Sequence, residues 1–326
     1  MKVQAIFELL KATYQEWTND RTSRLGAALA YYAVFSLAPV LVIVIAVASL
    51  VFGEKAARGQ VAAEVQLVAG PEVGRAVEEM LSHTHATGAG WWATAVSIVV
   101  LLFSATAVFA ELQDGLNTIW GVKARPDRGW LNTIRTRFWS FMIVLGLALL
   151  LLLALAAATA VTAVNTFLGP SLPAGTAFLW RLLDLAITLG LLTLLFAMIY
   201  KVLPDVKIAW RDVWVGAVIT AVLFTAGTYL IGLYLGWSSV ASAYGAAGSP
   251  MVLLLWVYYS SQVLLFGAEF TQVYACKYGR PLVREDRAEP VTPEARARQG
   301  MSGTKSAAER FCTAVGAERT DAARTV

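Results

Sequence analysis

Long uncharged runs alternate with short charged segments along this chain. No charged side chain lies between Arg137 and Arg181, and none lies between Asp212 and Glu269. About 20 apolar residues in a helix span the hydrocarbon layer of a membrane, so the second run is long enough for two passes and a turn. This pattern excludes a water-soluble fold. It predicts an all-α integral membrane protein with six transmembrane helices, at about 27–52, 91–110, 139–165, 178–200, 213–235 and 249–273.

Two amphipathic segments accompany the first run. Five apolar residues near the N-terminus recur at steps of four and three, which places them on one helical face: Val3, Phe7, Leu10, Tyr14 and Trp17. We expect this helix to lie in the membrane interface, with packing on a cytosolic loop as the alternative. Apolar residues at helical spacing on both sides of Pro71 predict a small extracytoplasmic helical hairpin over about 53–90.

Three domains follow from this organisation. An interfacial amphipathic part covers 1–26, the six-helix transmembrane domain covers 27–275, and a cytoplasmic tail covers 276–326. The tail is charged and has few large apolar residues, so we expect it to be disordered. Both cysteines, Cys276 and Cys312, fall in this tail, where a reducing cytoplasm predicts free thiols.

Charge sets the expected orientation. The chain is 15% charged, against about 25% in a typical soluble domain. The net charge of +4 does not form one basic patch, so we expect no nucleic-acid partner. Basic residues concentrate before the first run, between the second and third, between the fourth and fifth, and in the tail, whereas the loops 166–178 and 237–248 have none. The positive-inside rule then places both termini in the cytoplasm, and we expect membrane lipids as partners.

Several short motifs occur in a fixed order along the predicted helices. They are AYYAVFSLAP at 30–39, LNTIWG at 116–121, LPD at 203–205, YGA at 244–246, WVY at 256–258 and GAE at 267–269. Together, over about residues 5–275, these motifs resemble the YihY/BrkB family, also labelled "virulence factor BrkB" and once mislabelled "ribonuclease BN". The resemblance implies a six-helix bacterial inner-membrane protein of poorly defined activity, with members regarded as candidate transporters of lipids or ions.

The sixth predicted helix carries the main candidate site. Four polar side chains fall within about 80° of one another on a helical projection: Tyr258, Gln262, Glu269 and Gln272. Such a stripe should face the bundle or a water-filled cavity, because exposing it to lipid is costly. Glu269 is the sole acid in its apolar segment. We interpret it either as a proton or cation site, or as a structural carboxylate that meets a loop arginine near the cytosolic interface.

Two other helices add candidates for a transport path. Tyr32, Ser36 and Pro39 share one face of the first helix, and Pro39 removes a backbone hydrogen bond. Broken helices line substrate sites in transporters, although prolines also occur in membrane helices for packing. Arg181 and Asp184 lie three residues apart in the fourth helix, which favours a structural ion pair, and Asp184 is also a candidate for the path.

Two further patterns are less specific. Gly232 and Gly236 have the spacing of a close helix contact, which we assign to packing within the chain, leaving a homo-oligomer open. His83 and His85 could begin a metal site, but the sequence offers no convincing third and fourth ligand, so we expect no metal.

The parts of a catalytic site are missing from the sequence. It has no P-loop, no G-x-S-x-G elbow and no convergent carboxylates in one aqueous loop, so we expect neither an enzyme nor a cofactor. The leading hypothesis is a small transporter or lipid-translocating permease, with a polar path between helices one, four and six. Its substrate would be an unidentified small molecule, ion or lipid. The rival hypothesis is a non-transporting membrane scaffold or envelope-assembly protein, which a dry, tightly packed bundle would favour.

Overall fold

The computed structural model describes residues 3–36, 53, 59, 63, 65–66, 70–82, 107–124, 176–237, 248–279, 283–284 and 288–301. These residues are mostly helical, with two short strand pairs. Three helical segments are long and apolar enough to cross a membrane: Leu185–Val202, Trp210–Trp237 and Pro250–Tyr278. A mostly helical membrane protein is therefore confirmed. The count of six spans stays a prediction, because 37–52, 91–106 and 139–165 lie outside the described residues.

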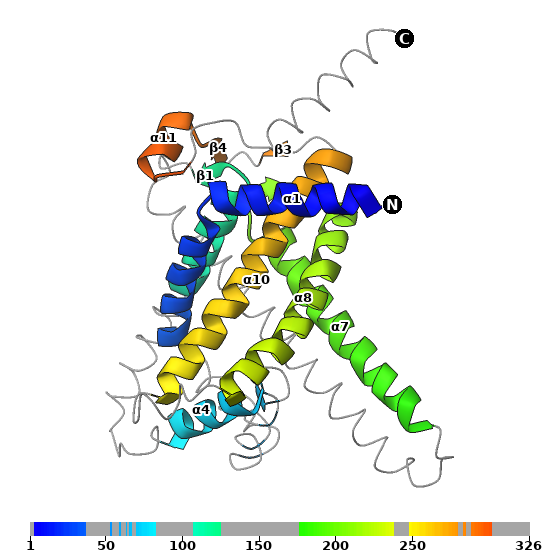
Figure 1. Ribbon diagram of the computed structural model, residues 1–326. Helices are drawn as coiled ribbons and strands as arrows, with labels where there is room; N and C mark the ends of the chain where they lie inside the picture. The colour runs from blue at the N-terminus through cyan, green and yellow to red at the C-terminus, as the bar shows by residue number, and fades with distance from the viewer. Residues whose placement is uncertain are drawn as a thin grey trace.

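The bundle is built on three long helices. These are α7 (Thr176–Val202), α8 (Trp210–Trp237) and α10 (Gly248–Tyr278), and α8 packs against both of the others. Figure 1 shows them as tilted rods, with α8 and α10 leaning the same way and α7 leaning the opposite way. Their shared core is apolar and aromatic, and it includes Phe196, Tyr200, Val213, Phe224 and Leu265.

Glycines allow α8 and α10 to approach closely. A Cβ added at Gly216 would overlap the side chain of Thr271, and one at Gly267 would overlap the hydroxyls of Thr220 and Tyr200. The Tyr200 hydroxyl donates to the Leu264 carbonyl at 2.7 Å. The two glycines therefore let side chains of neighbouring helices pack directly against the helix backbone.

The sequence assigned Gly232 and Gly236 to a close helix contact. No described atom lies within 4 Å of a Cβ built at either position. The assignment stays a prediction, because 37–52, 91–106, 139–165 and 238–247 lie outside the described residues. Among the described residues, Gly216 and Gly227 of α8 and Gly267 of α10 lie against side chains of a neighbouring helix.

Helix α1 (Val3–Asn19) lies across one end of the bundle (Figure 1) and packs on α10. Its buried face carries Leu9 and Ala12, which join an apolar cluster with Phe270 of α10. Phe7 is 69% exposed and Tyr14 is 62% exposed. The apolar stripe noted in the sequence therefore points away from the bundle, where lipid can cover it. The position of α1 in the membrane interface stays a prediction.

Two strand pairs lie at the same end of the bundle as α1 (Figure 1). β1 (Val122–Ala124) pairs antiparallel with β4 (Ala288–Pro290), and β2 (Val206–Lys207) pairs antiparallel with β3 (Val283–Arg284). A short helix, α11 (Pro293–Arg298), follows β4. Part of the tail that we expected to be disordered is thus ordered, because β1 and β2 supply it with backbone hydrogen-bond partners.

The opposite end of the bundle carries α4 (Pro71–Ser82), which packs on α10 and α8 (Figure 1). Val73 and Val77 of α4 are buried in an apolar cluster with Leu235 and Val252. This helix belongs to the predicted hairpin over 53–90, most of which lies outside the described residues. The charge pattern assigned α1 and the basic loops to one side of the membrane and the segment 53–90 to the other. In the structure, α1 and α4 lie at opposite ends of the bundle.

One expectation about the cysteines is wrong. Cys276 is disulfide-bonded rather than free, and Cys312 lies outside the described residues. The expectation rested on compartment alone, since sequence does not show which sulfurs meet. Disulfides are uncommon in a reducing cytoplasm. The disulfide therefore favours an α1 end that lies outside the cytoplasm, whereas the basic loops favour an α1 end that lies inside it.

Cysteine labelling decides the orientation. With Cys276 and Cys312 replaced by serine, single cysteines would be placed at the exposed positions Glu78 on α4 and Lys207 on β2. The positive-inside rule predicts that an impermeant maleimide labels position 78 in intact cells and position 207 only after the membrane is opened. The reverse pattern would place the α1 end outside, on the oxidising side that suits the disulfide.

Packing at the helix crossing gives a second prediction. Gly267→Ala should lower the thermal unfolding midpoint in detergent, since overpacking a tight contact costs about 1–3 kcal/mol. Gly236→Ala is the matched control, because no described atom lies within 4 Å of its Cβ position. Equal midpoints for the two variants would show that α8 and α10 do not cross as described.

Candidate functional site

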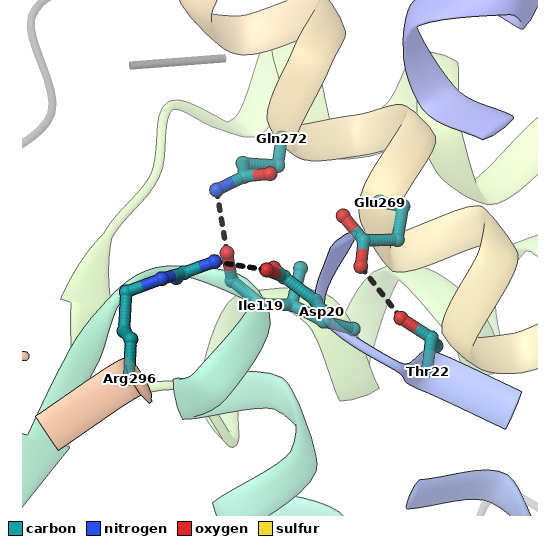
Figure 2. A network of polar contacts seen from close by, with 6 residues as sticks. All are labelled: Asp20, Thr22, Ile119, Glu269, Gln272 and Arg296. Carbon is teal, nitrogen blue, oxygen red and sulfur yellow. Dashed lines mark hydrogen bonds and ion pairs between the residues drawn. The ribbon is translucent and has the colours of Figure 1, made fainter. Parts of the chain in front are cut away.

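The polar stripe of α10 faces into the bundle. Gln262 Nε2 donates to the Ser23 carbonyl at 3.1 Å, and Glu269 Oε1 accepts from the Thr22 hydroxyl at 2.8 Å. Gln272 Nε2 donates to the Ile119 carbonyl (Figure 2). Three polar side chains of one helix thus reach two other parts of the chain, as the cost of exposing them to lipid predicts.

A sharp turn brings the partners of Glu269 into place. α1 ends at Asn19, and a new helical segment, 22–36, begins almost at once. Arg21 between them has a φ of 50°, which is uncommon for a residue other than glycine. Such a conformation costs about 1–3 kcal/mol and persists only when the surroundings enforce it. Here it lets both Asp20 and Thr22 turn toward α10.

Three carboxylates gather at this turn, and we call them the carboxylate cluster: Glu16, Asp20 and Glu269. All three are buried, and Glu269 is 0% exposed. Arg296 of α11 forms an ion pair with Asp20 (Figure 2). Glu16, Asp20 and Arg296 all lie close enough to Glu269 to act on it electrostatically.

One carboxylate oxygen of Glu269 has no hydrogen-bond partner among the described residues. Thr22 occupies Oε1, whereas the buried Oε2 has no hydrogen-bond partner among the described residues. Buried carboxylates are normally satisfied, because leaving a charged acceptor unpaired is costly. The second oxygen of Glu269 is therefore able to hold a proton.

The carboxylate cluster is not placed as a metal site, and neither is any other group of side chains that the structure describes. Across the parts of the chain that the structure covers, no group of three or more His, Cys, Asp or Glu side chains is placed to hold a metal ion. His83 and His85 lie outside those parts.

The other predicted path residues do not join Glu269. Ser36 is buried and donates to the carbonyl of Ala33 in its own helix at 2.9 Å. Tyr32 and Tyr258 are both exposed. Tyr258 is thus the one member of the predicted α10 stripe that is exposed. Pro39 lies outside the described residues, and the side chains of Arg181 and Asp184 in α7 are likewise not described.

Sequence reasoning missed four residues of this site: Glu16, Asp20, Thr22 and Arg296. Neither Glu16 nor Asp20 belongs to the apolar stripe of α1, and neither lies on the polar stripe of the sixth predicted helix, so the sequence patterns did not select them. The available signal was their spacing of four residues, which puts both on one helical face with Thr13 and Leu9. No local pattern could have identified Arg296, since its contact with Asp20 spans 276 residues.

A second polar contact joins two of the sequence motifs. Asn117 Nδ2 donates to Asp205 Oδ2 at 2.9 Å, and the Asp205 backbone N–H donates to Asn117 Oδ1 at 2.9 Å. This reciprocal pair ties the helical segment 107–119 to the turn after α7. It fixes the end of the bundle on which the carboxylate cluster lies, so its role is structural.

Comparison with known proteins finds a family and several relatives. The family model described as "Virulence factor BrkB" matches residues 13–291. A "UPF0761 membrane protein" of Pseudomonas aeruginosa is 29% identical over 265 residues, which cover 80% of this chain and 61% of that protein. A protein with the same description from Stenotrophomonas maltophilia is 30% identical over 280 residues, covering 82% and 61% respectively.

The chain spans only about 61% of the length of these relatives, and no solved structure matches it. The family match includes the whole carboxylate cluster and ends before Arg296. Its extent across most of the chain, together with the apolar spanning helices, supports one conclusion: the chain is a membrane protein that belongs to the Virulence factor BrkB family.

Proposed function

We propose that this protein is a small transporter or lipid-translocating permease of a bacterial inner membrane, in which Glu269 exchanges a proton or a small cation. The observation that carries the proposal is a fully buried carboxylate, on a membrane-spanning helix, with one oxygen left without a described partner. Ionisable side chains within membrane helices are costly, and they commonly mark ion pathways and proton relays.

The surroundings of Glu269 support exchange rather than a fixed structural bond. Thr22 donates to one oxygen only, so the other can accept a proton or coordinate a cation. Asp20 and Glu16 add negative charge beside it, and Arg296 adds positive charge. A change of occupancy at Glu269 would therefore alter the electrostatic balance of the turn that joins α1 to the next helical segment.

Polar atoms extend the site along α10. Two more buried side-chain oxygens on the same face of α10 as Glu269 have no hydrogen-bond partner among the described residues: Gln262 Oε1 and Gln272 Oε1. Unsatisfied acceptors and hydroxyls are rare in protein interiors, and a series of them on one membrane helix is typical of a route that water or a polar substrate visits. We infer that the path follows α10 and the start of segment 22–36.

Replacing the carboxylate tests the proposal. Glu269→Gln keeps the shape and can still accept from Thr22, but it cannot exchange a proton or bind a cation by charge. We expect the variant to insert and unfold like the wild type, yet to lose the phenotype that the intact gene restores to a deletion strain. Glu269→Asp should restore part of that phenotype, because the charge remains on a shorter side chain.

Glu294→Gln is the matched control, since Glu294 is an exposed carboxylate at the same end of the molecule. It should complement the deletion fully. If Glu269→Gln complements as well as Glu294→Gln does, with an unchanged melting temperature, Glu269 is structural. The scaffold hypothesis, in which the bundle only anchors envelope machinery, would then replace the transporter.

A further inference from the structure

The ordered part of the tail, residues 288–301, covers the end of the bundle that holds the carboxylate cluster, and we call it the clasp. Its first residues pair with β1 in the register Val122↔Pro290 and Lys123↔Glu289. The Val291 N–H extends this pairing by donating to the Gly121 carbonyl at 3.1 Å. These bonds fix where α11 begins relative to the bundle.

Local signals define the short helix of the clasp. The Thr292 hydroxyl accepts from the Ala295 N–H at 3.2 Å, and a proline stands in the first turn. Both features are typical of a helix start. A helix of this length is not stable alone, because nucleation is unfavourable. The order of α11 therefore depends on what it contacts.

The contacts of α11 converge on the turn that shapes the site. The Arg296 side chain is 13% exposed, and its partner Asp20 is 2% exposed. A Cβ added at Gly300, which has a φ of +76°, would lie 2.8 Å from Arg21 Nη1, so the guanidinium of Arg21 rests against the end of the clasp. Two neighbouring residues of the turn are thus held by the same short segment.

Arg296 and α11 lie beyond the residues that the family model matches. The match covers residues 13–291, which include Glu16, Asp20, Thr22 and Glu269, and it ends before Arg296. The carboxylates therefore lie within the matched part of the chain, whereas the guanidinium that pairs with one of them lies outside it.

We propose that the clasp is an intramolecular gate, with Arg296 occupying Asp20 in place of an exchangeable cation. The proposal rests on the function proposed for Glu269 and adds its regulation. While Arg296 is bound, the cluster is covered and shielded from water. Release of α11 exposes Asp20, frees the turn at Arg21 and opens Glu269 to protons or cations from the solvent.

Hydrogen–deuterium exchange of the full-length protein in lipid nanodiscs tests the gate. Arg296→Gln should increase the exchange rate of peptides covering residues 16–25 at least tenfold. Arg298→Gln is the matched control, because Arg298 is exposed on the same helix, and it should exchange like the wild type. Equal exchange in the two variants would overturn the proposal.

A second set of variants separates a gate from a general loss of stability. Asp20→Asn should increase exchange at least as much as Arg296→Gln does, because Asp20 has other interactions besides the one with Arg296. Adding Arg296→Gln to Asp20→Asn should increase exchange no further, because the contact between them is already broken. Arg296→Lys should restore most of the protection. Faster exchange throughout α8 in Arg296→Gln would overturn the gate, since it would show that Arg296 stabilises the whole bundle.

The gate and the proposed function can fail separately. Exchange is measured without any assay of transport, so complementation by Glu269→Gln would refute the function while leaving the exchange result unaffected. Conversely, unchanged exchange in Arg296→Gln would remove the gate and leave Glu269 as an ungated exchange site.

Discussion

Burial of charge inside an apolar bundle is the constraint on which the site depends. Glu269 lies on α10 with no exposed surface, and Glu16 and Asp20 are buried beside it. Such a group is tolerated only with partners, because an isolated buried charge is very costly. The chain supplies them from distant positions, Thr22 at the start of a helix and Arg296 in the tail. The left-handed turn at Arg21 follows from the same need.

Close packing makes these contacts possible. Gly216 of α8 accommodates the side chain of Thr271, and Gly267 of α10 accommodates the hydroxyls of Thr220 and Tyr200, which fixes the rotation of α10 about its own axis. That rotation turns Gln262, Glu269 and Gln272 toward the interior rather than toward lipid. Helix packing and site geometry are therefore coupled, and a side chain added at Gly267 would disturb both.

Sequence patterns predicted the features that depend on local periodicity. The apolar runs at 178–200, 213–235 and 249–273 correspond to spanning helices, and the stripe of α10 faces inward at Gln262 and Glu269. Features that depend on long-range contacts were missed. The tail was expected to be disordered because it is charged and has few large apolar residues. Its strand partners could not be inferred, because 122–124 lies about 160 residues before 288–290 and 206–207 lies about 75 residues before 283–284. The contact between Asp20 and Arg296 cannot be inferred from local sequence either.

The central claim is that Glu269 is an exchange site covered by a removable clasp. Proton flux into vesicles containing the purified protein, measured under an imposed pH gradient with a dye trapped inside, tests it most directly. The account predicts that Arg296→Gln dissipates the gradient faster than the wild type, and that adding Glu269→Gln to that variant abolishes the gain. It is contradicted if vesicles with Arg296→Gln dissipate the gradient no faster than vesicles without protein, or if the double variant is as fast as the single one.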